Sequence, residues 1–290
     1  MGKGTRKTGN VEDYRLELLG YNRERFERER DERFVAWQAM KRMVEDPSVP
    51  NTEKHNLQCE FALKYGGLTF NTNPTAWIFC RGCFLKQHCC VCSRWNKGYT
   101  PSTRVIVHMH HAEWGRGSNT GIILAESLRG CEVLIKGHKE HDNTLQDILQ
   151  DPGNLVAMLW PGGGALEPGQ LVERVAQHPG KRLVVIVIDA TWKAATNMAH
   201  RLPGGVCKVV MPPGASLFAE GYSVSLLSPI RMYRGSFEES GRVSTLEAVA
   251  ALLCALGEPT EIRDGLLQNL KVKVDSMLVQ KGLPTVYGTA

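Results

Sequence analysis

The chain has 290 residues, of which 42% are hydrophobic and 22% charged, and its formal net charge is +5. This length and composition suffice for one sizeable hydrophobic core with a small accessory module beside it. The longest apolar runs, residues 183–188 and 248–256, are too short to span a bilayer, and the basic N-terminus lacks the apolar stretch of a secretory signal. We therefore expect an intracellular protein without a membrane segment, in the cytoplasm or the nucleus, with an organelle left open.

The first 50 residues form a highly charged segment, in which every residue from 23 to 33 except Phe26 is charged. Opposite charges three and four residues apart stabilise a helix in water. The pattern therefore predicts a long, solvated helix over residues 11–45 within an N-terminal extension, residues 1–50. This extension is either an arm that touches RNA or simply an exposed helix.

The next segment, residues 51–103, is rich in cysteine and aromatic residues, and five of the nine cysteines lie in residues 80–92. An odd number of crowded thiols is not typical of a disulfide framework, whereas four thiolates can close a tetrahedral zinc site. The spacing C-x2-C-x6-C-x-C gives the ligands Cys80, Cys83, Cys90 and Cys92. His88 and Cys89 are competing ligands, and a group of free thiols is the alternative. Because a closed four-thiolate site leaves no position for water, the predicted zinc is structural.

The remainder, residues 104–290, alternates short apolar runs with stretches long enough for helices. The runs that we predict as strands are residues 104–110, 131–135, 155–160, 182–189 and 208–211. Helices are predicted over residues 191–201, 245–256 and 262–280. The run 183–188 is apolar at every position, which is typical of a parallel strand covered on both faces. The alternation indicates that residues 104–290 form an α/β sandwich with a mainly parallel sheet.

A polar sequence, Asp189-Ala190-Thr191-Trp192, directly follows the most apolar predicted strand. In open α/β sheets, ligands bind beyond the carboxyl ends of the strands, so Asp189 is a candidate functional carboxylate. The alternative is that Asp189 or Thr191 only caps the helix that follows. Trp192 is either a stacking surface for a base or a core residue.

Two further motifs are expected at the same edge of the sheet. The turn Pro161-Gly162-Gly163-Gly164 follows the strand 155–160, and it either presents backbone N–H groups to a ligand or is a plain turn. His110, His111 and Glu113 follow the first strand and are themselves followed by Asn119-Thr120-Gly121. The histidines and the glutamate are candidate ligands or acid–base groups, although His110 alone is equally well a hydrogen-bonding residue at a strand end.

The last motif lies at the start of the helix predicted from residue 245. Ser244, Thr245 and Glu247 indicate a helix start, which we do not interpret as a full capping box. Arg231 and Arg234 precede this start and are candidates for holding a carboxylate or a phosphate.

Taken in order, these motifs resemble those of the DTW-domain family, the tRNA-uridine aminocarboxypropyltransferases. That family combines a C-x2-C…C-x-C cluster with H-P-x-E…N-T-G, P-G, D-x-T-W and S-T-L-E-A stretches. The likeness covers about residues 80–257. His111 stands where the family has Pro, which can alter the shape of that loop, and Val243 stands where it has Leu. The resemblance implies a SPOUT-related α/β fold with a knotted C-terminal half.

The resemblance also implies a reaction, in which the 3-amino-3-carboxypropyl group of S-adenosylmethionine moves to N3 of a uridine in tRNA. It implies catalytic roles for Asp189, Thr191 and Trp192, with Asp189 as general base or as partner of the donor's ammonium group. The implied donor pocket comprises Asn119, Thr120, Gly121, Pro161, Gly162, Gly163, Gly164, Arg231, Ser244, Thr245 and Glu247. The basic residues Arg81, Lys86, Arg94 and Lys97 either guide tRNA or are ordinary surface charge.

Three alternatives to this function stay open. The chain could carry out the same transfer on ribosomal RNA, could transfer a methyl group as a SPOUT-type enzyme, or could be a zinc-stabilised RNA-binding protein without catalysis. The mass of the product separates the two transfers, and the identity of the modified RNA separates the two acceptors. The sequence specifies neither the uridine position nor the oligomeric state.

Overall fold

The structure, a computed structural model, describes residues 11–67, 76–203, 206–211, 224–233 and 243–289. Its centre is a sheet of five strands in the order β2-β1-β4-β3-β5, and every neighbouring pair is parallel. The strands are β1 Arg104–His110, β2 Glu132–Lys136, β3 Asn154–Leu159, β4 Arg182–Asp189 and β5 Cys207–Val209. The α/β fold with a parallel sheet is thereby confirmed, and β4, the most apolar strand, lies in its middle.

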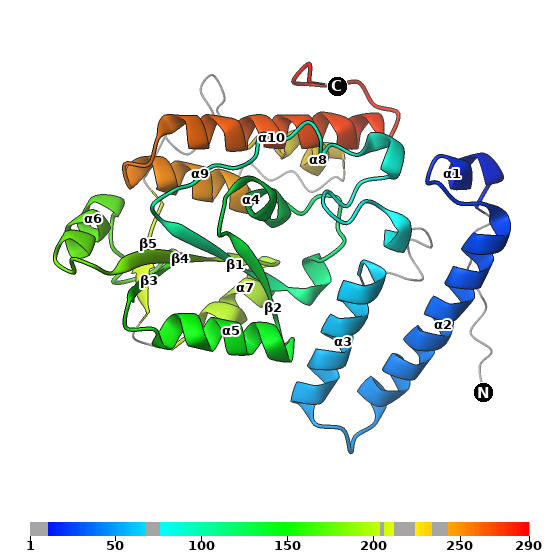
Figure 1. Cartoon of the computed structure of the whole chain (residues 1–290), viewed down its shortest axis with the longest axis horizontal. Helices are drawn as coiled ribbons and strands as arrows, with labels where there is room; N and C mark the ends of the chain where they lie inside the picture. Colours follow the sequence, from blue (N-terminus) through cyan, green and yellow to red (C-terminus); the bar gives the residue numbers. More distant parts are fainter. Residues whose placement is uncertain (1–10, 68–75, 204–205, 212–223, 234–242, 290) are drawn as a thin grey trace.

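Helices cover both faces of the sheet, which gives three layers (Figure 1). The helices on one face are α4 Gly121–Ser127, α6 Pro168–Ala176, α9 Thr245–Ala255 and α10 Thr260–Val279, and their apolar residues share a core with Val105 and Val107 of β1. The helices α5 Lys139–Gln150 and α7 Trp192–Ala199 lie on the other face, where Leu145 and Ile148 pack on Ile106. Because side chains alternate along a strand, His108 shares the α5 and α7 face with Ile106.

The charged N-terminal segment corrects one prediction, because the long helix expected over residues 11–45 is interrupted. It consists of α1 Asp13–Glu17 and α2 Arg23–Glu45. Gly20 has a φ of 72°, and the Asn22 side chain accepts a hydrogen bond of 2.8 Å from the N–H of Arg25, which caps α2. On α2, the buried Phe26 stacks on Trp77, with ring centroids 6.0 Å apart.

A further helix, α3 Asn51–Tyr65, lies beside α2 as the second arm of a helical hairpin (Figure 1). After α3 comes the Cys-rich segment, of which residues 76–103 are described and contain two short 3-10 turns, η1 Ala76–Ile78 and η2 Gln87–Cys89. Between β1 and α4 lies a third turn, η3 His111–Glu113, and α8 Ser228–Tyr233 precedes α9. None of the described helices has the length and apolar character needed to cross a membrane.

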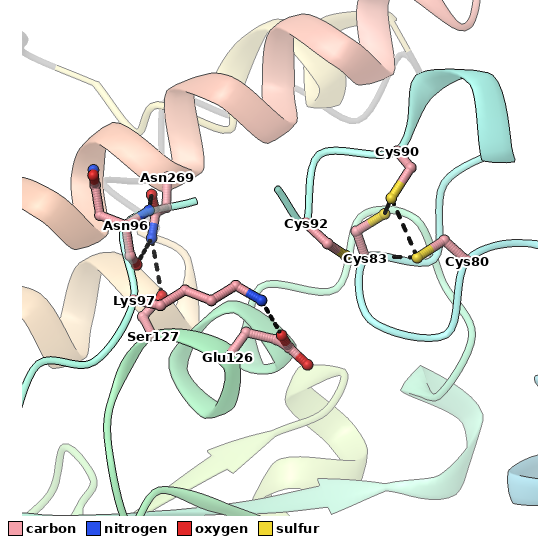
Figure 2. Close-up of polar contacts among 9 residues, drawn as sticks. All are labelled: Cys80, Cys83, Cys90, Cys92, Asn96, Lys97, Glu126, Ser127 and Asn269. Carbon is pink, nitrogen blue, oxygen red and sulfur yellow. Dashed lines mark hydrogen bonds and ion pairs between the residues drawn. The ribbon is translucent and has the colours of Figure 1, made fainter. Parts of the chain in front are cut away.

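Polar contacts join the Cys-rich segment to α4 and α10 (Figure 2). The Asn269 side chain on α10 accepts a hydrogen bond of 2.8 Å from the N–H of Asn96 and donates to the Asn96 carbonyl and to Ser127 Oγ. Lys97 and Glu126 form an ion pair of 2.7 Å. The division of the chain at residues 50 and 103, the SPOUT relation and the knot stay predictions.

Candidate functional site

The carboxylate of Asp189 is the centre of a buried polar network at the carboxyl end of β4. Its Oδ2 accepts a hydrogen bond of 2.7 Å from Asn119 Nδ2, and its Oδ1 accepts one of 3.1 Å from Thr245 Oγ1. The backbone N–H of Gly121 also donates to it. Asp189 thus joins the first residues of α4 and α9. It is not the cap of α7, because the N-cap residue there is Thr191, whose side chain makes no capping hydrogen bond.

The Asn119-Thr120-Gly121 motif has a structural reason for its residue types. Asn119 Oδ1 accepts a hydrogen bond of 2.9 Å from the N–H of Ile122 at the start of α4, while its Nδ2 donates to Asp189. A Cβ on Gly121 would lie 2.5 Å from Asp189 Oδ2 and 2.9 Å from a methyl carbon of Val107. Only glycine therefore lets α4 start this close to the carboxylate.

Lys273 is a buried cation that adjoins this network. The side chain is 1% exposed, and its Nζ donates a hydrogen bond of 2.6 Å to the Asn119 carbonyl. Burial lowers the pKa of Lys273 to about 8. Burial also raises the pKa of Asp189, opposed by the hydrogen bonds from Thr245, Asn119 and Gly121 and by the charge of Lys273. The sequence reasoning missed Lys273, although a lysine with Leu266, Leu270 and Met277 on its helix face was a usable signal.

A cavity of about 560 Å³ lies beside Asp189, beyond the carboxyl ends of β3 and β4. Five of the predicted site residues line it, namely Pro161, Trp192, Arg231, Ser244 and Thr245. The rings of Trp160 and Trp192 meet edge to face on its wall, with centroids 5.6 Å apart. Aromatic and aliphatic side chains with one guanidinium and two hydroxyls suit an amphipathic ligand of nucleoside size.

Several predicted site residues lie off this wall. Asn119, Thr120 and Gly121 are buried, and Asp189, which is 8% exposed, lies behind Thr245 rather than on the wall. Thr191 is exposed at the start of α7 and does not line the cavity.

The glycines of the Pro161–Gly164 turn are exposed, and a Cβ on Gly162, Gly163 or Gly164 would have no atom within 4 Å. Gly162 has a φ of 151° and Gly164 one of 75°, so both positions favour glycine through backbone conformation. Of this motif, Pro161 alone reaches the cavity wall.

Glu247 stabilises the start of α9 and the residues before α8. Its carboxylate accepts hydrogen bonds of 2.7 Å from Ser225 Oγ, from the N–H of Leu226 and from the N–H of Ser244. Because Ser244 Oγ also accepts from the N–H of Glu247, the two residues form a full capping box on α9. This corrects our interpretation of the motif as an incomplete one, since the S-x-x-E spacing was already in the sequence.

The four predicted zinc ligands lie together. The Sγ of Cys80 is 3.4 Å from that of Cys90 and 3.5 Å from that of Cys92, and Cys83 and Cys90 are 3.8 Å apart. A zinc ion 2.3 Å from four sulfurs needs tetrahedron edges of about 3.8 Å. All four sulfurs lie within 4.8 Å of one another, so the cluster fits zinc (Figure 2). His88 and Cys89, the competing ligands, are not part of this group.

The remaining candidates are mostly engaged with the protein itself. His110 Nδ1 accepts a hydrogen bond of 3.2 Å from the N–H of Ala112, so His110 is a satisfied residue at a strand end. Arg81 donates to the Lys64 carbonyl, and Lys97 is paired with Glu126. Arg234 lies outside the described residues.

The chain belongs to the DTW domain family, whose profile matches residues 78–278, more than half of the sequence. Comparison with curated proteins and with solved structures returned no match. The matched range includes the four cysteines, the Asp189 network and the cavity beside it. Membership of this family is consistent with a function in RNA modification.

Proposed function

We propose that this protein transfers the 3-amino-3-carboxypropyl group of S-adenosylmethionine to N3 of a uridine in tRNA. The observation that carries the proposal is the cavity that Pro161, Trp192, Arg231 and Thr245 line together, directly beside the buried Asp189. These residues come from distant motifs of the family, and the fold brings them to one edge of the sheet. A volume of about 560 Å³ is of the order that a nucleoside-sized donor needs.

The lining residues match the chemical groups of the donor. The indole rings of Trp160 and Trp192 offer surfaces on which adenine stacks, and the Arg231 guanidinium is suited to the donor's carboxylate. Ser244 and Thr245 supply hydroxyls on the same wall. The carbon that the pocket aligns with the nucleophile decides which arm of the sulfonium moves, so positioning decides between aminocarboxypropyl and methyl transfer.

Asp189 acts in this proposal through Thr245. As N3 of the uridine attacks the donor carbon, the S–C bond breaks, and Thr245 Oγ takes the N3 proton while passing its own proton to Asp189. The hydrogen bond of 3.1 Å between Thr245 Oγ1 and Asp189 Oδ1 supports this path. Burial raises the pKa of Asp189, which makes the carboxylate a stronger base than an exposed aspartate. The rival role, in which Asp189 holds the donor's ammonium group, would require the carboxylate to turn toward the cavity.

The acceptor must present N3, which lies on the Watson–Crick edge, so the uridine has to be unpaired or extruded from its stack. The zinc ion, held by Cys80, Cys83, Cys90 and Cys92, would have a structural role, because all four ligand positions are taken.

The proposal is tested by incubating the protein with separate pools of tRNA and ribosomal RNA and with donor labelled in the carboxyl group or in the methyl group. Carboxyl label in tRNA and none in ribosomal RNA is the expected result. Methyl label in either RNA would show a methyltransferase, and label in ribosomal RNA alone would move the activity to that acceptor. Binding of tRNA without any label transfer would show a non-catalytic RNA-binding protein.

A further inference from the structure

A second cavity, of about 590 Å³, lies on the face of the sheet that α5 and α7 cover, at the carboxyl ends of β1 and β2. Its walls come from α3, β1, β2, α5 and the end of α7, which are far apart in the sequence. We call it the basic cavity because Lys136, Lys139 and Arg201 line it. None of these residues belongs to the motifs that the sequence analysis singled out.

The positive charges of the basic cavity are not neutralised by direct partners. Across the part of the chain that the structure describes, no carboxylate forms an ion pair with Lys136, Lys139 or Arg201. Burial and the charge of Arg201 lower the pKa of Lys136, opposed by the charge of Asp142, and both cations line the same space. An anion between them would relieve this repulsion.

Two acidic residues, Glu53 and Asp142, also line the basic cavity, but neither forms an ion pair with its cations. Both carboxylate oxygens of Asp142 lie 3.1 Å from the N–H of Gly137, so that charge is directed to the backbone. Glu53 is exposed on α3 and therefore solvated.

The buried wall of the basic cavity holds an unsatisfied polar group. His108 is 4% exposed, and its Nδ1 has no hydrogen-bond partner among the described residues. Burial lowers the pKa of His108 to about 4, so the imidazole is neutral at physiological pH. An unsatisfied buried polar atom is uncommon in folded proteins. Because the other ring nitrogen of His108 donates to the backbone of Leu134, Nδ1 is the acceptor of the neutral ring, and a hydroxyl next to the phosphate, such as a ribose 2′-OH, would satisfy it.

Helix α7 connects this space to the cavity beside Asp189. Trp192 and Ala195 of α7 line the first cavity, and Met198 lines the basic cavity together with Arg201 just beyond the helix. An eight-residue helix is about 12 Å long. A short RNA segment can therefore occupy both ends of α7 at once.

We propose that the basic cavity binds a backbone phosphate of the RNA segment that flanks the target uridine, with Lys136 and Arg201 as its ligands. This inference rests on the proposed function, since it assigns a second contact to the RNA whose target uridine binds in the first cavity. The phosphate contact fixes the position of the strand and carries no base specificity.

The test compares Lys136→Gln, Arg201→Gln and the double variant with a matched double variant, Arg174→Gln with Lys181→Gln, whose residues are exposed and line neither cavity. The measurement is the binding of a short fluorescent oligouridylate over a series of KCl concentrations. We expect the basic-cavity double variant to bind about tenfold more weakly at low salt, with a salt dependence shallower by about one unit. Arg201→Lys, which keeps the charge, should restore most of the affinity.

Affinity and salt dependence equal to those of the matched control would overturn the inference, as would an oligouridylate that the unaltered protein does not bind. Binding of S-adenosylmethionine by calorimetry should be the same in all variants, which shows that the first cavity is intact. If the protein labels tRNA but the basic-cavity variants bind RNA like the control, this inference alone fails. If RNA binding depends on the basic cavity but no label is transferred, the proposed function alone fails.

Discussion

Lys273 donates a hydrogen bond of 2.6 Å from its Nζ to the backbone carbonyl of Asn119, the residue whose side chain holds Asp189. The ammonium group also lies 6.0 Å from the ring of Phe84 and 5.9 Å from that of Trp95, both in the Cys-rich segment. One buried cation on α10 therefore contacts both the Cys-rich segment and the Asn119 loop, which positions the Asp189 carboxylate.

Replacing Lys273 by Met should remove this link while keeping most of the side-chain volume. The Asn119 carbonyl would lose a charged donor, and Asp189 would lose the favourable charge of Lys273, so we expect the free energy of unfolding to fall by about 2 kcal/mol. Chemical denaturation measures this loss. Lys193→Met, at an exposed position on α7, is the control, and equal stability of the two variants would contradict a special role for Lys273.

Replacing Gly121 by Ala should disturb the hydrogen bonds of Asp189 at the start of α4. The added Cβ would lie 2.5 Å from Asp189 Oδ2, so the start of α4 or the carboxylate must move. Overpacking of this kind costs about 1–3 kcal/mol, which thermal unfolding would detect. Gly163→Ala is the control, because a Cβ there meets no atom within 4 Å. A Gly121→Ala protein as stable as this control would show that the close approach is not required.

The cysteine cluster predicts one tightly bound zinc ion per chain. Cys83→Ser should lose this zinc and lower the melting temperature by about 10 °C, because the segment depends on the metal in place of a large core. Cys254→Ser, outside the cluster, should keep both properties. Metal analysis together with thermal unfolding measures the effect. A purified protein free of zinc and equally stable with and without a chelator would contradict the assignment.

The buried His108 predicts a loss of stability in mild acid. Burial lowers its pKa from 6.5 to about 4, so between these values the unfolded chain binds a proton that the folded chain does not. The free energy of unfolding is therefore unaffected by His108 above pH 6.5. It falls as the pH drops toward 4, and at pH 5 the loss is about 2 kcal/mol. Denaturant unfolding at pH 7 and pH 5 measures it. His108→Leu should reduce the drop and His178→Gln should not, and an unchanged drop in His108→Leu would assign it to other groups.

Much of the sheet could be predicted from the sequence, because the strands of a covered parallel sheet are short apolar runs and β4 is apolar at nearly every position. The order of the strands could not, since β1 lies between β2 and β4 through packing rather than through any local pattern. The break at Gly20 was also missed, because the charge pairs on either side of it favour a helix throughout.

The candidate site was predictable in its members but not in their arrangement. The motifs identified Asp189, Asn119 and Thr245 from their places after strands or before helices, and the structure joins them by hydrogen bonds. That the carboxylate lies behind Thr245 depends on how α9 packs against β4, which spacing does not encode. The basic cavity could not be predicted, because Lys136 and Arg201 line one space only after α5 packs on β2 and α7 packs on β4.

The most direct test of the account is the Asp189→Asn variant, incubated with tRNA and carboxyl-labelled S-adenosylmethionine. Loss of the proton acceptor should lower label transfer by at least about 100-fold, because a positioned acid–base group contributes 10²–10⁴-fold. Binding of the donor to Asp189→Asn, measured by calorimetry, should be retained. Thr245→Val should lose label transfer to a similar extent, whereas Thr144→Val on α5 should be fully active. Full label transfer by Asp189→Asn would contradict the account, because neither a proton relay nor an ammonium-binding role could then belong to this carboxylate.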